Sequence, residues 1–515
     1  MWTWIWAIVS GVLVIVVVFD LVQKHHAVLR NFPLIGHFRY LFELVGPELR
    51  QYIVTSNDEE RPFDRDQRRW IYASAKQQNS YFGFGTDNDL EQSPNHVIIK
   101  HATLGESAPR PGDKNYDPQY TLPCAKVLGA SRRRSKAFRP NSVINLSAMS
   151  FGSLSAAAVE ALNRGARISC CLHNSGEGGI SPHHMHGAEL IWQLGTGYFG
   201  CRDRSGRFDL AQFKDTVARH PIRAIEIKLS QGAKPGMGGV LPATKISKEI
   251  AKIRGIPMGE DCLSPAAHSE FGDADSMLDF VEKLADESGL PVGIKSAVGQ
   301  NEFWTELATL IATTDRGVDF ITIDGGEGGT GAGPLVFTDH VALPFKLGFS
   351  RIFRIFAREG LSDRVLFTGS GRLGLPEEAL LAFALGCDTI NVGREAMLAV
   401  GCIQAQRCHT GHCPTGVATQ SKWLMRGLDP TYKAARLANY IVALRKEILL
   451  LSRACGTSHP ALLTGDHFEL LNDHFGTTSL YEVFGYDTAW GMPSRDDRTA
   501  IARLMNDEDT DAGNT

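Results

Sequence analysis

The stretch Thr389-Ile-Asn-Val-Gly-Arg394 joins a short apolar strand to a glycine turn, and similar units recur along the chain. From about residue 141, short apolar runs alternate with helix-like segments, a pattern typical of βα units. An eighth strand is expected near Gly259–Leu263, in addition to seven clearer candidates: Val143–Met149, Ile168–His173, Ala224–Leu229, Pro291–Ser296, Phe320–Asp324, Arg364–Thr368 and Thr389–Val392. Eight such strands predict an α/β fold, a (β/α)8 TIM barrel, although a doubly wound open sheet would show the same pattern.

A cysteine-rich run, Cys402-Ile-Gln-Ala-Gln-Arg-Cys408-His-Thr-Gly-His-Cys413, follows shortly after this stretch. Three thiolates suit an iron–sulfur cluster with one open corner better than a structural zinc, which normally takes four N or S ligands. His409 or His412 could complete a zinc site, so the run alone leaves both metals open. Its position after a strand end is where barrels hold their ligands.

Glycine-rich segments follow several of the predicted strands: Ser150–Ser153, Asn174–Gly179, Gly325–Gly333 and Gly369–Gly371. Backbone N–H groups in such turns bind phosphate, and TIM barrels often place a phosphate site after their last strands. None of these segments puts the dinucleotide pattern Gly-x-Gly-x-x-Gly after a first strand. Flavin mononucleotide therefore fits the pattern better than NAD.

Charged residues in or just after apolar strands are candidate ligand-binding groups. Lys228, Lys234 and Lys295 are candidates to hold anions, because an unpaired ammonium is expensive to bury. Glu177 lies between glycines at a strand end. Its carboxylate could pair with an amine, an iminium or one of these lysines.

The N-terminal segment Trp2–Phe19 has no charged residue, and with the apolar residues that follow it is long enough to span a ~30 Å hydrocarbon core. A secretory signal would need a basic leader and a small-residue cleavage site, and neither is present. A buried core helix is the other alternative. Lys24, Arg30 and Arg39 follow the apolar run, so we expect a single-pass N-terminal membrane anchor with the catalytic domain in the cytoplasm.

Composition limits the classes of function. A net charge of −4 over 515 residues gives no basic surface for nucleic acid. Ten cysteines, mostly scattered, fit a reducing compartment rather than a disulfide framework. The expected organisation is a transmembrane helix (1–23), a juxtamembrane and lead-in segment (24–140), the barrel with its cysteine loop (141–425), a helical C-terminal extension (426–505) and a disordered tail (506–515).

These motifs together resemble the FMN-binding synthase domain of the glutamate synthase family. The similar segments occur in the family's order: Asn145–Ser155, Asn174–Gly179, Gln231–Gly236, Gly328–Ala332 and Gly401–Gln420. In that family the domain is a (β/α)8 barrel that carries FMN and a 3Fe-4S cluster. It reduces the 2-iminoglutarate formed from 2-oxoglutarate and ammonia.

The resemblance implies a role for each matching position. The implied residues are Cys402, Cys408 and Cys413 as cluster ligands; Ala148, Met149, Ser150 and Lys295 along the flavin; Gly326, Gly369, Gly371, Gly393 and Arg394 near its phosphate; and Glu177, Gln231, Lys234 and Arg254 facing the 2-oxo acid.

The chain also departs from the family pattern. Full-length members begin with a glutaminase domain where this chain has an apolar span, so we expect it not to draw ammonia from glutamine by itself. The segments Ser370–Arg372 and Gly326–Gly329 differ from the family's sequences near the phosphate and the substrate.

We therefore expect a glutamate-synthase-like oxidoreductase acting on CH-NH2 donors. Its partners would be 2-oxoglutarate or a related 2-oxo acid, ammonia, and a ferredoxin or an NAD(P)H-oxidising subunit as electron donor. One alternative is a flavin enzyme that joins another amine, such as methylamine, to glutamate. The other is a non-catalytic membrane electron-transfer subunit.

Overall fold

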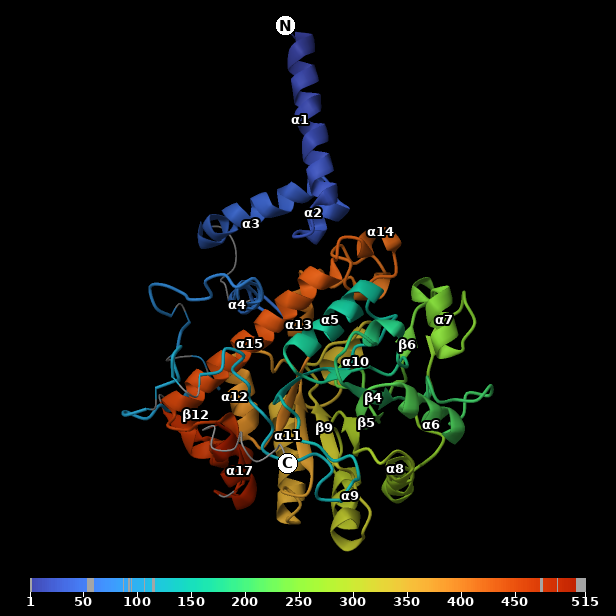
Figure 1. Ribbon diagram of the computed structural model, residues 1–515. Coiled ribbons are helices and arrows are strands. Elements are labelled where there is room, and N and C mark those ends of the chain that lie inside the picture. Colours follow the sequence, from blue (N-terminus) through green and yellow to red (C-terminus); the bar gives the residue numbers. More distant parts are fainter. Residues whose placement is uncertain are drawn as a thin grey trace.

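Eight parallel strands close into a barrel in this computed structural model, in the order β10-β11-β2-β3-β4-β5-β8-β9 (Figure 1). They are β2 (Ile144–Leu146), β3 (His173–Asn174), β4 (Leu190–Leu194), β5 (Ile222–Lys228), β8 (Val292–Ser296), β9 (Phe320–Asp324), β10 (Leu366–Ser370) and β11 (Thr389–Val392). Their residues are almost all buried, because helices cover the outside and side chains fill the interior. The predicted (β/α)8 TIM barrel is confirmed.

The structure describes residues 2–52, 60–86, 88–90, 93, 95–105, 107–113, 116–472, 476–488 and 490–505, with the backbone alone for 47–52. The predicted disordered tail, 506–515, lies outside these residues.

Helices return the chain between most strands: α5 (Ala156–Ile168), α6 (Leu210–Arg219), α8 (Ala274–Ser288), α9 (Glu302–Thr313), α11 (Phe345–Arg358) and α12 (Pro376–Ala384), while α13 (Arg394–Val400) follows the last strand. Between β3 and β4 the described chain forms only the short 3-10 turn Pro182–His184. The long helix α15 (Pro430–Ala454) packs along α5. Its N-cap is Asp429, whose side chain accepts a hydrogen bond from Tyr432 N at 2.8 Å.

Two of the strand predictions were wrong in position. The expected strand near Gly259–Leu263 is β7 (Cys262–Leu263), which pairs antiparallel with β6 (Val240–Leu241) outside the barrel. The eighth strand of the barrel is instead β4, which was not predicted and which precedes the Gly195–Gly197 turn. The predicted strand Ile168–His173 begins in α5, and β3 starts only at His173. Between them Cys170 adopts a φ of 53°, which turns the chain off the helix.

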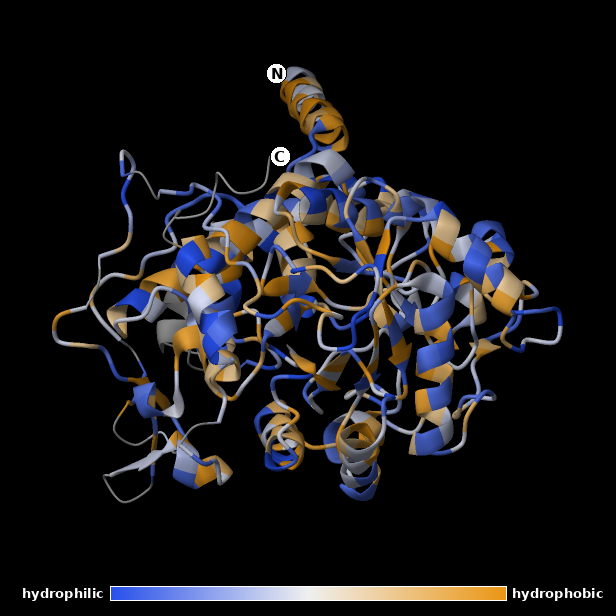
Figure 2. Cartoon of the chain, turned by 60° about the horizontal axis from the view of Figure 1, so that its bottom comes forward, coloured by the Kyte–Doolittle hydropathy of each residue, from blue (hydrophilic) through white to orange (hydrophobic). Residues whose placement is uncertain are grey.

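The N-terminal helix α1 (Trp2–Val22) stands out from the body, and its surface is apolar (Figures 1 and 2). It is long and apolar enough to cross a membrane, and only 6% of its most apolar window is buried, so it is not a core helix. Asp20 at its end is fully buried and pairs with His37 Nε2 at 2.9 Å. This pair fixes α1 to α3 (Ile35–Tyr52), which follows the short α2 (Ala27–Asn31).

The remaining elements lie outside the barrel sheet. The lead-in segment contains β1 (Val97–Ile99) and a helix that the sequence did not predict, α4 (Arg65–Ala75). β1 pairs with β12 (Phe468–Leu471), which pairs with β13 (Thr477–Ser479). The other helices are α7 (Lys248–Arg254), α10 (Leu335–His340), α14 (Lys422–Met425), α16 (Leu480–Phe484) and α17 (Arg495–Met505).

Candidate active site

A partly buried ion pair joins two loops at the mouth of the barrel, where the strands end. Lys228, the last residue of β5, donates hydrogen bonds to Glu177 Oε1 at 2.6 Å and to Gln231 Oε1 at 2.7 Å. Glu177 lies in the loop after β3, and Gln231 lies in the loop after β5. The structure therefore brings together Glu177 and Gln231, which the resemblance assigned to the substrate, through a lysine that the sequence analysis had singled out.

The Glu177 carboxylate is held in its ionised form. Burial alone would raise the pKa of Glu177, but the ammonium of Lys228 outweighs burial, with help from Lys234 and Arg254, and the pKa lies below its usual value. A glycine makes room for this carboxylate. A Cβ atom at Gly195 would come within 2.6 Å of Glu177 Oε2, so a side chain there would displace it.

A polar network inside the barrel supports the loop that carries Glu177. The fully buried Glu226 accepts hydrogen bonds from Asn174 Nδ2 at 2.8 Å, Gln193 Nε2 at 2.6 Å and Thr322 Oγ1 at 2.7 Å. A buried carboxylate is tolerated only when its oxygens are satisfied in this way. Asn174 is thereby held at the base of the Glu177 loop. The sequence analysis did not identify Glu226.

Two further buried cations, Lys234 and Arg254, lie around Glu177. Lys234 Nζ donates to Ala332 O at 3.0 Å, and burial lowers the pKa of Lys234 to about 8. Arg254, the last residue of α7, donates through Nη2 to Phe151 O at 3.2 Å, while its Nε is buried without a hydrogen-bond partner. Gly178 lets Arg254 approach, because a Cβ there would lie 2.7 Å from Nη2. Both cations keep donors available for an anion.

Lys295 lies on β8 and faces a different partner. Its Nζ is 3.5 Å from Asp324 Oδ2, at the end of β9, and both side chains are buried. Asp324 Oδ2 also accepts a hydrogen bond from Gly232 N at 2.8 Å, in the loop that carries Gln231 and Lys234. Asp324 was not predicted as a site residue. It connects the lysine expected beside the flavin to the loop expected to bind the substrate.

The predicted phosphate-binding residues gather at the ends of β9, β10 and β11. The backbone of Gly371 lies close to Gly325, next to Gly326, and Gly393 begins α13 beside Ser147. Gly369 differs from these, because it lies within β10 and a side chain there would collide with Leu373, Cys387 and Phe345.

Two arginines stand at this end of the site. The guanidinium groups of Arg372 and Arg394 lie 5.4 and 5.3 Å from the ring centre of Phe63, which comes from the lead-in segment. Arg394 also donates a hydrogen bond to Glu327 O. Arg394 was expected near the phosphate. Arg372 was noted only as a departure from the family pattern.

The cysteine loop packs on the loop after β2, which contains Ala148, Met149 and Ser150. Lys245 Nζ donates to Ser153 O at 2.8 Å and to Cys408 O at 3.2 Å, and Gln420 Nε2 donates to Leu154 O at 2.8 Å. The segment predicted to line the flavin and the predicted cluster ligands are therefore neighbours.

The three cysteines of the loop are free thiols that influence one another. Burial, with smaller contributions from the neighbouring Cys413 and Cys408, raises the pKa of Cys402 to about 12. Gln404 and Gln406 adopt φ angles of 55° and 54°, so the loop is tightly curled. Across the described residues, no group of three His, Cys, Asp or Glu side chains has the arrangement of a metal site.

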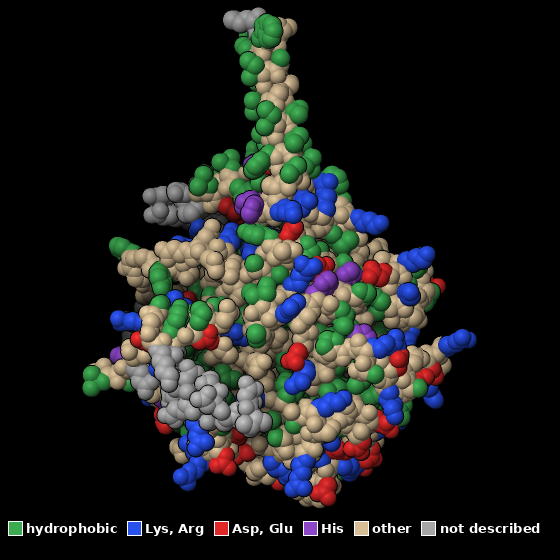
Figure 3. Space-filling model, in the orientation of Figure 1, with side chains coloured by type: hydrophobic (Ala, Val, Ile, Leu, Met, Phe, Trp, Pro, Cys, Tyr) green, Lys and Arg blue, Asp and Glu red, His purple; other side chains and the backbone are tan. Residues whose placement is uncertain are grey.

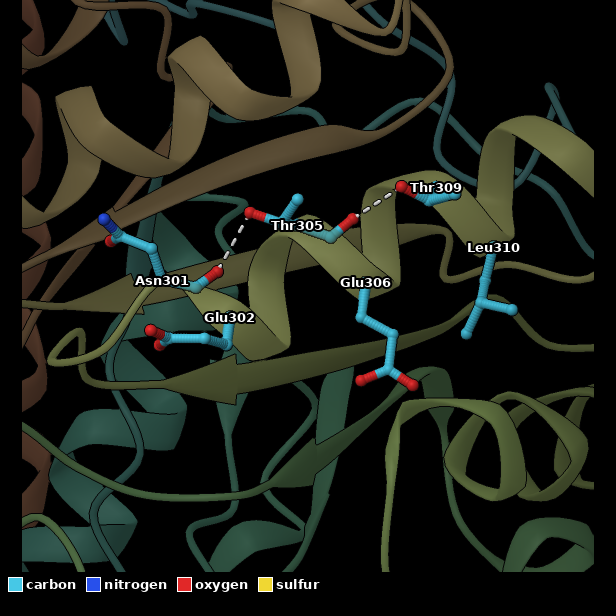
Figure 4. Close-up of a pocket in the computed structure, with 6 residues that line it drawn as sticks. All are labelled: Asn301, Glu302, Thr305, Glu306, Thr309 and Leu310. Atoms are coloured by element: carbon cyan, nitrogen blue, oxygen red, sulfur yellow. Dashed lines mark hydrogen bonds between the residues drawn. The ribbon is translucent and has the colours of Figure 1, made fainter.

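A shallow hollow also lies on the outer surface, along α9 (Figure 4). Its lining residues are Asn301, Glu302, Thr305, Glu306, Thr309 and Leu310. Most of them are exposed, and the hollow contains none of the predicted site residues. It carries no part of the candidate active site.

Comparisons with known proteins agree with the motifs. A family model described as the conserved region in glutamate synthase matches residues 124–458. The chain is 36% identical over 474 residues to the glutamate synthase large subunit-like protein YerD of Bacillus subtilis, covering 86% of this chain and 90% of that protein. It is 35% identical over 349 residues to the archaeal glutamate synthase (NADPH) of Methanocaldococcus jannaschii, covering 67% of this chain and 65% of the relative.

Similar solved structures include a flavocytochrome b2 variant with benzoylformate, with 14% identity, a TM-score of 0.44 and coverage of 84% of this chain and 92% of that one. Together the barrel and the sequence matches define a TIM-barrel oxidoreductase. The chain belongs to the glutamate synthase family.

Proposed function

We propose that the protein is an FMN- and 3Fe-4S-dependent oxidoreductase that reduces the 2-imino acid formed from 2-oxoglutarate and ammonia to L-glutamate. The observation that carries the proposal is the gathering of Lys228, Lys234 and Arg254 around Glu177 at the barrel mouth. A dicarboxylic 2-imino acid requires cations for its carboxylates and an anion near its imine nitrogen. This cluster supplies both.

Each residue of the cluster has a specific task in this proposal. Arg254 and Lys234 bind the substrate carboxylates by charge-assisted hydrogen bonds. Glu177 remains ionised, so it can accept a hydrogen bond from the N–H of an ammonium or iminium group. Gln231 uses its oxygen to hold Lys228 and keeps its amide N–H groups for the ligand.

The residues at the mouth also fit FMN. Glycine turns and the guanidinium groups of Arg372 and Arg394 suit a phosphate, and the buried Met149 offers an apolar wall. Lys295 would place a positive charge against the flavin ring. When bound, FMN would supply the hydride for the imine carbon.

The cysteine loop suits an iron–sulfur cluster by the chemistry of its donors. Cys402, Cys408 and Cys413 would provide three soft thiolate ligands on one curled loop. A bound cluster would supply electrons one at a time. Lys245, which touches the backbone of Cys408, would help to balance the negative charge of the thiolates.

The decisive experiment is an anaerobic reoxidation assay with the chemically reduced protein. We expect 2-oxoglutarate and ammonium together, but neither alone, to restore the absorbance of oxidised flavin and to yield glutamate. Methylamine in place of ammonium tests the alternative amine. Reoxidation by neither amine, with flavin fully bound, would contradict the proposed reaction and favour an electron-transfer subunit.

We also infer that α1 anchors the protein in a membrane with the barrel mouth toward the bilayer. Asn31 of α2 donates hydrogen bonds to Pro414 O at 3.0 Å and to Leu424 O at 2.9 Å, which ties the base of the anchor to the end of the cysteine loop and to α14. Figure 1 shows α3 running across the axis of α1. Its apolar side chains Ile35, Phe38 and Phe42 are exposed. This geometry suits a helix lying at the membrane surface.

The anchor predicts that the full chain stays with membranes after an alkaline wash and needs detergent for release. A variant that begins after residue 23 should be released by the same wash. N-terminal sequencing of the membrane form should still find the first residues. Their removal by a signal peptidase, or release of the full chain without detergent, would contradict the anchor.

A further inference from the structure

A group of basic residues lies between the juxtamembrane helices and the barrel. Lys433 and Arg436 are neighbours on α15 and are 1% and 6% exposed. Lys76, at the end of α4, and His26, before α2, are close enough to affect their charge. We call these four residues the basic cluster.

The two buried cations of the basic cluster have almost no compensation. Lys433 Nζ donates one long hydrogen bond, to His25 O at 3.4 Å, and lies 5.3 Å from the ring centre of Tyr432. For Arg436, neither a hydrogen bond nor an ion pair occurs within the described parts of the chain, and its Nε is fully buried without a partner. The acid whose charge acts on Lys433 is Asp429, which already lies 3.5 Å from Lys24 Nζ.

Burial of this kind is unfavourable for the folded protein. Burial, together with the charge of Arg436, lowers the pKa of Lys433 to about 7. Burial also lowers the pKa of Arg436, and the groups that oppose this effect are the hydroxyls of Tyr432, Tyr72 and Tyr40, which are uncharged at neutral pH. Buried cations are normally paired, so an anionic partner is expected here.

The carbonyls at a helix end compensate the charge of only one of the two buried cations. Lys433 Nζ lies beside Gly401, at the C-terminus of α13, where the backbone carbonyls carry partial negative charge. Arg436 donates no hydrogen bond to such a carbonyl in the described chain. The unpaired Arg436 therefore indicates that the cluster binds an anion that is not part of the protein.

The location of the cluster indicates where this ligand comes from. The base of the anchor is held against α14, because Trp423 Nε1 donates to Asn31 O at 3.1 Å and Arg426 Nη2 donates to Arg30 O at 3.0 Å. It also contacts the start of α15, where Lys433 Nζ donates to His25 O at 3.4 Å. Figure 3 shows basic side chains gathered on the body where α1 leaves it. With α1 in a membrane, the cluster lies at the level of the lipid headgroups.

We propose that Lys433 and Arg436 bind the phosphate of an anionic phospholipid headgroup, with Lys76 and His26 at the rim of the site. The guanidinium of Arg436 is suited to two hydrogen bonds with a phosphodiester, and Lys433 adds a point charge. The bound lipid would fix the anchor to α15. The proposal rests on the membrane attachment inferred above.

The test measures thermal unfolding of the full chain in an uncharged detergent, with short-chain phosphatidylglycerol as the probe. At a saturating concentration we expect the midpoint of unfolding to rise by about 3 °C. Short-chain phosphatidylcholine and inorganic phosphate should give no comparable rise. An equal rise with inorganic phosphate would identify a free phosphate site, and an equal rise with phosphatidylcholine would indicate uncharged lipid contacts; either overturns the proposal.

Two variants separate binding from folding. Arg436→Gln and Lys433→Gln should lose the phosphatidylglycerol response, while without lipid they should unfold at the same temperature as the native chain or a higher one, because an unpaired buried charge is removed. Lys422→Gln is the matched control, since it removes an exposed lysine from α14. An unchanged response in the first two variants would overturn the proposal.

Two further outcomes are distinguishable. If the glutamines abolish bound iron without changing the lipid response, the cations serve the cysteine loop instead, and the lipid site is wrong. If the alkaline wash releases the full chain, the anchor is wrong, whatever the lipid response. The wash can therefore contradict the anchor, and the thermal unfolding can contradict the lipid site, each without the other.

Discussion

Cys408→Ser is expected to remove the bound iron and to leave FMN binding largely intact. A serine hydroxyl keeps the shape of the side chain but is a poor ligand for iron, and a three-thiolate site has no spare ligand. The backbone of Cys408 would still accept the hydrogen bond from Lys245, so the loop should keep its packing. Iron content per chain and flavin absorbance, measured on the same preparation, check both halves of this expectation.

The matched control for this variant is Cys455→Ser. Cys455 is a buried free cysteine at the end of α15, away from the cysteine loop. It should keep both iron and flavin. If Cys408→Ser retains its iron, or if the native protein contains zinc in place of iron, the cluster assignment is wrong.

The barrel could be predicted because its strands are short apolar runs at regular intervals, and β9 and β11 were predicted with the correct bounds. The position of β4 was missed because Trp192 and Gln193 interrupt the aliphatic pattern that marked the other strands. The eighth strand was assigned to the region of β7 instead, because a two-residue strand in a hairpin resembles the end of a longer strand in sequence. Which of the two segments joins the barrel depends on pairing with strands distant in sequence, and local sequence does not reveal that pairing.

For the site, the sequence indicated the charged residues but not all their partners. Lys228 and Glu177 were each singled out, and the structure joins them in one ion pair. Asp324 was missed, although it ends a predicted strand next to the strand of Lys295. Reading consecutive parallel strands as neighbours would have placed these two side chains together. Glu226 gave no such signal, because a single acid within an apolar strand does not reveal which side chains surround it.

Arg254→Ala and Lys234→Ala are expected to weaken the use of 2-oxoglutarate much more than FMN binding. Each substitution removes a charged hydrogen bond to a substrate carboxylate, which should cost about 1.5–3 kcal/mol, a factor of ten or more in affinity. Lys295→Ala should act in the opposite way and reduce flavin occupancy first, because it leaves Asp324 without its buried cation. Lys252→Ala, an exposed lysine on the same helix as Arg254, is the control and should change neither property.

Lys234 also predicts a pH dependence. Its folded pKa of about 8 is below the ordinary value because burial disfavours the ammonium form, so the positive charge is present below pH 8 and is lost above it. A bound carboxylate favours the ammonium, so the Michaelis constant for 2-oxoglutarate should rise at or above pH 8. Lys234→Arg should keep its charge and flatten this rise. Equal loss of flavin in the Arg254, Lys234 and Lys295 variants would show that the substrate and cofactor sides of the site have been assigned the wrong way round.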